Sequence, residues 1–104
     1  MPTLMRLCLA SLLVLTHTSA LADTYVIVIE NMRYTPASLA LKRGDRVVWE
    51  NRDLFPHTAT ADTNAFDSDD LPSQQSWTWD AEKPGDYAYH CAYHPMMTAR
   101  LIVR

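Results

Sequence analysis

The chain has 104 residues, of which 48% are hydrophobic and 20% charged, and its formal net charge is −3. A chain of this length is expected to fold as one small domain. Its mild acidity argues against nucleic acid or an anionic membrane surface as the partner.

The start of the chain has the three parts of a secretory signal peptide. Arg6 precedes an apolar run that is too short to span a bilayer, and Ala-Leu-Ala at residues 20–22 forms a cleavage pattern. The sequence therefore predicts a signal peptide at residues 1–22 and one domain at residues 23–104, soluble and exported to the periplasm. That domain has 82 residues and a net charge of −4.

Strands are expected from the first residues of this domain onward. Thr24–Glu30 is nearly continuously apolar and β-branched, which suits a strand inside a core. Residues 38–51 predict a hairpin, with a tight turn at Arg43 and Gly44 between its two strands.

The second half of the domain predicts three more strands. Residues 76–81 alternate and place two tryptophans on one face. A turn at Pro84 and Gly85, with the glycine at positive φ, leads into a strand that ends at Cys91. Residues 98–104 form the last strand.

Short apolar runs separated by turns, without a sustained helical period, predict an all-β fold, either an antiparallel sandwich or a small barrel. The least patterned segment is 62–76, which has room for a short helical turn and carries aspartates between Asp62 and Asp70. It is interpreted as an acidic surface loop, either a solvated connection or a docking patch for a basic partner.

The domain contains a single cysteine, because Cys8 lies in the expected signal peptide. A lone Cys91 in an oxidising compartment is a buried inert thiol, a nucleophile, half of an intermolecular disulfide or a metal ligand. A bound metal would also stabilise a secreted domain that has no internal disulfide.

Three potential metal ligands follow one another at intervals of three residues: Cys91, His94 and Met97. A compact turn after a strand can direct all three toward one point. His57, directly after Pro56, is the best candidate for a fourth ligand. Two imidazoles, a thiolate and a weak axial thioether form the ligand set of a blue-copper electron-transfer site.

Other interpretations of this cluster remain. Zinc also binds histidine and cysteine, but a thioether is a poor zinc ligand and zinc sites usually use more than one cysteine. A cysteine nucleophile would pair with His94 or His90, but His90 points away from Cys91 on a strand, and the sequence shows no orienting group and no substrate pocket. Met97 is favoured over Met96 as the thioether ligand by its spacing.

The pattern His57 with Cys91-x-x-His94-x-x-Met97, preceded by "PGDYAYHC", resembles the cupredoxins, or blue copper proteins. Within that family it is most similar to the short-loop amicyanin and pseudoazurin type, over essentially the whole domain. The resemblance implies a Greek-key β-sandwich that binds one copper ion through His57, Cys91 and His94, with Met97 axial. It also implies an apolar electron-transfer surface around His94, for which the candidates are Leu54, Phe55, Pro56, Tyr93, Pro95 and Met96.

Two positions depart from the family pattern. Many cupredoxins have asparagine after the first histidine, where this chain has Thr58, whose hydroxyl is expected to take over part of the hydrogen bonding around the metal. Amicyanin-like loops have proline where this chain has Tyr93, and the backbone N–H of Tyr93 is expected to reach the Cys91 sulfur.

The sequence thus predicts an electron carrier, and not an enzyme. The resemblance implies redox proteins as partners, such as a c-type cytochrome, an amine dehydrogenase or a nitrite reductase, and the carrier is expected to be a monomer. The main alternative is a periplasmic chaperone or store that binds copper without redox cycling, and a structural or adhesive sandwich is a further one.

Overall fold

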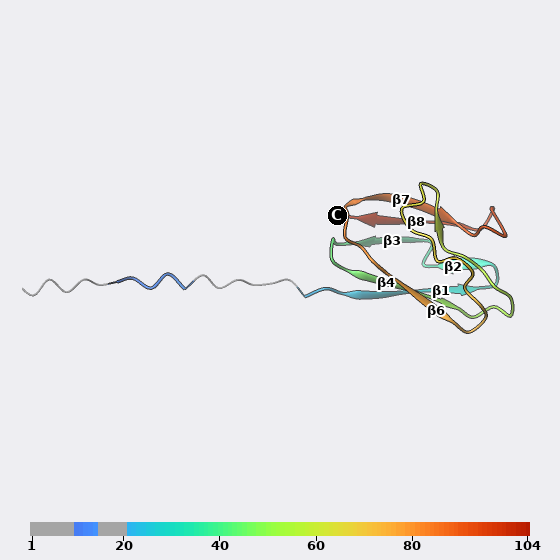
Figure 1. Cartoon of the computed structure of the whole chain (residues 1–104), viewed down its shortest axis with the longest axis horizontal. Helices are drawn as coiled ribbons and strands as arrows, with labels where there is room; N and C mark the ends of the chain where they lie inside the picture. Colours follow the sequence, from blue (N-terminus) through green and yellow to red (C-terminus); the bar gives the residue numbers. More distant parts are fainter. Residues whose placement is uncertain (1–9, 15–20) are drawn as a thin grey trace, which may run out of the picture.

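The computed structural model describes residues 10–14 and 21–104, so the expected signal peptide lies for the most part outside the described residues. The strands in residues 21–104 are β1 (Thr24–Glu30), β2 (Arg33–Thr35), β3 (Ser38–Leu41), β4 (Arg46–Asn51), β5 (Thr60–Ala61), β6 (Ser76–Asp80), β7 (Gly85–His90) and β8 (Thr98–Val103). They form two sheets, ordered β2-β1-β4-β6 and β3-β8-β7-β5, which stack as a sandwich (Figure 1). This arrangement confirms the predicted all-β class. No helix in the described residues is long and apolar enough to cross a membrane.

Each sheet contains one parallel pair of strands, so the predicted sandwich is not antiparallel throughout. β1 runs parallel to β4, and β3 runs parallel to β8. The other pairs are antiparallel. Parallel pairs arise here because segments distant in the sequence become neighbours, and these pairings leave no periodic signal in the sequence.

The predicted hairpin at residues 38–51 is also wrong, because β3 and β4 belong to different sheets. The turn between them is a corner from one sheet to the other. Its N–H groups bond to distant segments: Arg43 donates to the Arg104 carbonyl at 2.8 Å and Gly44 to the Ala81 carbonyl at 2.7 Å. Gly44 has φ 94°, a conformation that glycine adopts readily. Two strands joined by a tight turn give the same sequence pattern in a hairpin and in such a corner.

Gly85 serves a different purpose from the predicted one. Its φ is not positive, since Gly44 is the glycine with a positive φ in the described residues. A Cβ at Gly85 would lie 3.2 Å from the ring of Tyr87, whose hydroxyl donates to the Lys83 carbonyl at 2.6 Å. The missing side chain therefore lets the Tyr87 ring fold back over the start of β7.

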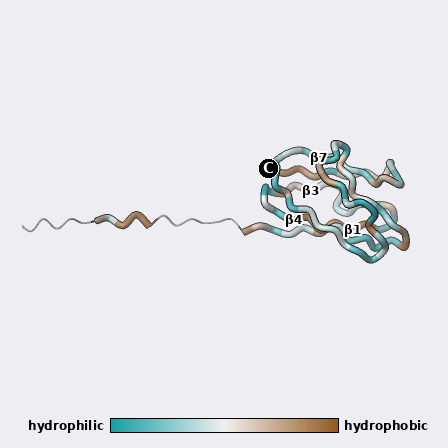
Figure 2. Tube along the Cα trace, viewed as in Figure 1, coloured by the Kyte–Doolittle hydropathy of each residue, from teal (hydrophilic) through white to brown (hydrophobic). Residues whose placement is uncertain are grey.

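The core between the sheets is rich in aromatic side chains. Trp49 of β4 donates from its indole N–H to the Tyr89 hydroxyl of β7 at 3.4 Å, which links the two sheets. Phe66 packs against Trp49 with 5.5 Å between ring centroids. Hydrophobic residues are concentrated along the strands, as in the last residues of β8, and hydrophilic residues in the connections (Figure 2). Burial of these large side chains is the main source of stability.

The connections after β1, β4 and β7 meet at the end of the sandwich away from the C-terminus (Figure 1). Residues 62–76 contain no helical turn. Instead, this segment has tight turns at residues 62–63 and 73–74, and two isolated bridges form in this part of the chain, His57 with Leu71 and Thr60 with Asp67. This arrangement fixes the chain around His57 beside the loop between β7 and β8.

Candidate metal centre

The loop between β7 and β8 is closed by its own backbone hydrogen bonds. His94 N–H donates to the Cys91 carbonyl at 3.2 Å, Met97 N–H to the His94 carbonyl at 2.8 Å, and Cys91 N–H to the Met97 carbonyl at 3.1 Å. The three-residue spacing thus corresponds to two consecutive turns. Cys91 is 0% exposed and Met97 is 6% exposed, whereas His94 is partly exposed.

His57 reaches the same place from the connection after β4. Its Nδ1 lies 3.7 Å from the Cys91 Sγ, and its ring centroid lies 5.7 Å from that of His94. Reciprocal backbone hydrogen bonds with Leu71, at 3.1 and 2.8 Å, hold the His57 backbone. His57 is 0% exposed, so this imidazole faces the thiol in the protein interior.

Asp53 orients the His57 ring, a contact that the sequence analysis missed. Its Oδ2 lies 2.7 Å from His57 Nε2. A carboxylate accepts a hydrogen bond here, so Nε2 carries a hydrogen and the opposite nitrogen, Nδ1, is the ring atom that faces Cys91. In the sequence, Asp53 lies four residues before His57. This spacing predicts a contact only when both side chains are known to be buried, as they are in the structure.

The same carboxylate binds the turn between β1 and β2. Asp53 accepts the N–H of Asn31 at 2.8 Å and that of Met32 at 3.0 Å. Burial by itself raises the pKa of Asp53, but hydrogen bonds from Met32, His57 and Asn31 outweigh it and lower the pKa. Asp53 is therefore ionised at neutral pH.

Asn51, at the end of β4, supports the segment that carries these groups. Its side-chain amide donates to the carbonyls of Phe55 and Leu71, both at 2.9 Å, and its oxygen accepts the Asp53 N–H at 3.0 Å. Asn51 is buried and its side-chain amide hydrogens and oxygen are all used. It therefore fixes the connection between β4 and His57.

The backbone N–H that reaches the Cys91 sulfur is that of Thr58, at 3.4 Å, and not that of Tyr93 as expected. Tyr93 is turned toward the surface, where its hydroxyl donates to Asp70. This hydrogen bond is the main reason that the pKa of Tyr93 is raised. Because this loop residue bonds outward to the acidic segment, its side chain tethers the loop to that segment.

The hydroxyl of Thr58 joins the two ligand-bearing segments. It accepts the Ala92 N–H at 2.8 Å and lies 2.9 Å from the Thr60 hydroxyl. Thr60 donates to Asp67 at 3.1 Å, so Thr58 donates to Thr60. These hydroxyl groups therefore connect the loop between β7 and β8, here called the ligand loop, with the acidic segment, residues 62–76.

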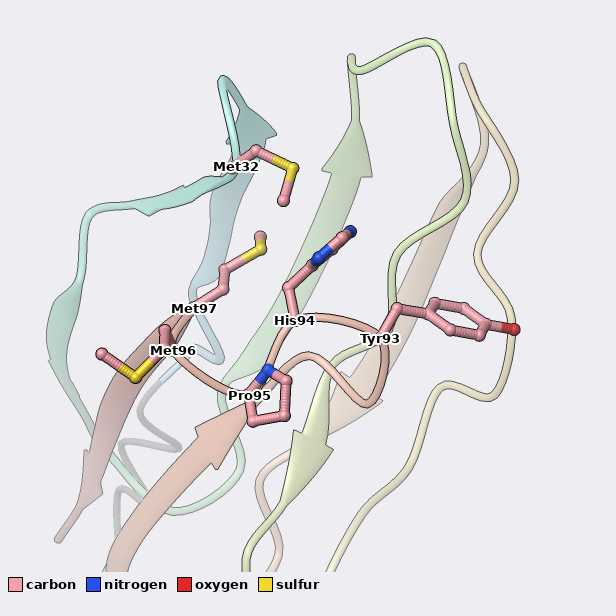
Figure 3. A pocket seen from close by; sticks show the side chains of 6 residues that line it. All are labelled: Met32, Tyr93, His94, Pro95, Met96 and Met97. Atoms are coloured by element: carbon pink, nitrogen blue, oxygen red, sulfur yellow. The ribbon is translucent and has the colours of Figure 1, made fainter.

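The six residues expected at the surface are all exposed: Leu54, Phe55, Pro56, Tyr93, Pro95 and Met96. His94 lies among the side chains of the loop, and Met32, which the sequence analysis did not place here, joins them from the turn between β1 and β2 (Figure 3). A partly exposed imidazole is thus surrounded by apolar and thioether groups.

The donor types gathered here fit copper better than a harder ion. Across the described residues, no three His, Cys, Asp or Glu side chains are grouped so as to hold a metal by themselves. The donors approach one another in pairs, His57 with Cys91 and His57 with His94, and the thioether of Met97 is buried in the same loop as Cys91 and His94. This mixed set of soft and intermediate donors is the one that copper electron-transfer sites use.

Comparison with known proteins identifies the family. The cupredoxin-like domain family matches residues 4–103. Amicyanin of Paracoccus versutus is 30% identical over 79% of this chain and 66% of its own length, and amicyanin of Paracoccus denitrificans is 31% identical over 79% and 67%. The chain thus spans about two thirds of the length of these relatives.

Solved structures agree with the sequence comparison. A methionine-to-alanine variant of amicyanin in its Cu(I) form has a TM-score of 0.73 at 27% identity, over 83% of this chain and 87% of its own. Another Cu(I) variant has a TM-score of 0.72 at 28% identity, over 78% and 82%. The fold is therefore the Greek-key sandwich that the sequence predicts, and the chain belongs to the cupredoxin family, with amicyanins as its relatives.

Proposed function

We propose that this protein is a single-electron carrier that holds one copper ion through His57, Cys91, His94 and Met97. The observation that carries the proposal is the contact between His57 and Cys91. The Nδ1 of His57 faces the Cys91 sulfur at 3.7 Å, and both residues are 0% exposed. A metal that cycles between Cu(I) and Cu(II) supplies the one-electron chemistry.

The residues around these ligands have distinct tasks. Asp53 keeps the His57 ring in one tautomer and orientation, which limits movement when the charge of the site changes. The Thr58 N–H directed at the sulfur stabilises negative charge on it. His94 is the ligand that reaches the surface, so electrons enter and leave through its ring.

Partners are proposed to meet the exposed residues around His94. Weak encounters between redox proteins use small interfaces, and these exposed, largely apolar residues suit such brief contacts. The family resemblance implies that these partners are redox proteins such as a c-type cytochrome, an amine dehydrogenase or a nitrite reductase. We further propose that the carrier is a periplasmic monomer made by removal of residues 1–22, and that it catalyses no reaction of its own.

The test is the visible and electron paramagnetic resonance spectrum of the purified protein with one equivalent of Cu(II). An intense thiolate-to-copper charge-transfer band is expected, together with reversible one-electron redox. Cys91→Ser should abolish the band. A colourless copper complex, or a spectrum unchanged by Cys91→Ser, would overturn the proposal and favour a protein that handles copper without redox cycling.

The same spectra test the axial ligand. Met97 is 6% exposed and Met96 is 95% exposed, which supports Met97. Met97→Ala should therefore change the spectrum and the redox potential, whereas Met96→Ala should leave both unchanged. The opposite result would transfer the role to Met96.

A further inference from the structure

A cavity of about 430 Å³ opens beside His94 and brings together methionines from distant parts of the chain. It is lined by Met32, Tyr93, His94, Pro95, Met96 and Met97. Met32 and Met97 extend toward the space beside the His94 ring, whereas Met96 points away from it (Figure 3). Two thioethers and an imidazole thus share one side of the candidate metal centre.

Met32 occupies a backbone position that does not favour a methionine. It has φ 61° and follows Asn31, with φ 53°, in the tight turn between β1 and β2. Glycine or asparagine is usual where a hairpin turn needs positive φ. The Asp53 carboxylate binds both N–H groups of this turn and also the His57 ring. The Asp53 carboxylate therefore fixes the position of the turn relative to His57. The methionine at this position has a strained backbone conformation.

We propose that Met32, His94 and Met97 form an outer capture site for Cu(I). Thioethers are soft, uncharged donors that favour Cu(I) over harder ions. Met32 is 36% exposed and Met97 is 6% exposed, so the three donors lead from the surface to the interior. His94 and Met97 belong to both sites. Loading therefore replaces one donor, Met32, by Cys91 and His57; the Cys91 thiol releases its proton to solvent as it binds, and the copper stays Cu(I).

This inference rests on the proposed function for the inner site, but Cu(I) binding by the outer site stands apart from it. The competing explanation for Met32 is an apolar contact with a protein partner. Leucine keeps the size and apolarity of methionine but lacks the sulfur, so Met32→Leu separates a donor from a contact. Met96→Leu is the matched control, because Met96 lines the same cavity with its side chain directed away.

The experiment is anaerobic loading of the metal-free protein from a coloured Cu(I)–chelator complex, followed by the loss of its absorbance. Met32→Leu should load about tenfold more slowly than the wild type, and Met96→Leu at nearly the wild-type rate. Met32→Gly, which removes the sulfur and relieves the strain, should also load slowly. All three variants should reach the same visible spectrum after oxidation. The proposal is wrong if Met32→Leu loads like the wild type or is slowed no more than Met96→Leu.

Cys91→Ser separates the two sites. This variant should still withdraw Cu(I) from a weak chelator, and the double variant Cys91→Ser with Met32→Leu should not. If the wild type lacks the charge-transfer band but Cys91→Ser binds Cu(I) through Met32, the electron-carrier proposal fails and the capture site stands. If the band forms and Met32→Leu has no effect on loading or on Cu(I) binding by Cys91→Ser, the capture site fails.

Discussion

The hydrogen bonds behind His57 and Cys91 decide how firmly these two side chains are held. The ring of His57 is hydrogen-bonded to the carboxylate of Asp53. The sulfur of Cys91 accepts a hydrogen bond from the backbone N–H of Thr58. Both supporting residues precede or follow His57 closely in the sequence, and both are buried. Substitutions at these two positions therefore test the site without removing a ligand.

Asp53→Asn should weaken Cu(II) binding and raise the redox potential. The variant removes a negative charge that stabilises the more positive oxidation state, and it relaxes the orientation of His57. Loss of such a hydrogen-bonded carboxylate typically lowers metal affinity by about 10- to 100-fold. Competition titration with a Cu(II) chelator and voltammetry measure the two effects. Glu50→Gln also removes one negative charge, but at a partly exposed residue paired with Arg52, and serves as the control. An unchanged potential in Asp53→Asn would contradict the assigned role.

Thr58→Val should destabilise the metal-free protein by about 1–2 kcal/mol. Valine has the shape of threonine but cannot accept the Ala92 N–H or donate to Thr60, so both groups lose a partner. Thr58→Ser keeps the hydroxyl and should lose less. Urea unfolding of the three proteins measures the difference. Equal stability of the valine variant and the wild type would show that water replaces the hydroxyl without cost.

At the scale of the elements, the corner between β3 and β4 is fastened by a carboxylate. Asp45 is 3% exposed and accepts the N–H of Asp23 at 2.9 Å and that of Lys42 at 2.8 Å. These two hydrogen bonds lower the pKa of Asp45. They hold the start of β1 and the end of β3 on the corner that connects the two sheets.

Asp45 should make stability depend on pH in the acid range. Because its pKa is lower in the folded state than in the unfolded chain, its contribution is fully present above the unfolded pKa of about 3.9 and is lost as the pH falls through the folded pKa. Urea unfolding of wild type and Asp45→Asn should therefore differ at neutral pH and converge in acid. The control is Glu82→Gln, a change at an exposed residue. Its stability relative to the wild type should not show a difference at neutral pH that disappears in acid. A constant difference between wild type and Asp45→Asn would refute this role.

The elements also show what the sequence could and could not predict. β1 was predicted with its observed bounds, and the spacing of Cys91, His94 and Met97 indicated one compact loop, because both depend on local periodicity. The sheet membership of β3 and β4 was missed because it depends on pairing with distant strands. The positions of Asp53 and Met32 depend on contacts 21 residues apart in the sequence, which composition and spacing do not reveal.

For the whole molecule, the relevant property is where the negative charge lies. The chain has a net charge of −3. Asp69 and Asp70 are exposed in the segment that the Tyr93 hydroxyl joins to the ligand loop. Glu82 is also exposed, but it lies before β7, whose other end leads to Cys91. The negative potential is therefore expected to be stronger near His94 than the net charge alone implies.

Electron exchange with a small cationic cobalt complex should accordingly slow as ionic strength rises. The Debye length shrinks from about 30 Å at 0.01 M to about 3 Å at 1 M, so salt screens the attraction between the complex and the aspartates. Asp69→Asn and Glu82→Gln change the net charge equally. Asp69→Asn should reduce the dependence of the rate on salt more than Glu82→Gln, because of these two residues only Asp69 belongs to the segment that Tyr93 joins to the loop between β7 and β8. Stopped-flow measurement of the reduced copper protein gives these rates. Equal effects of the two variants would mean that the net charge alone governs the encounter and that the acidic segment is a solvated connection.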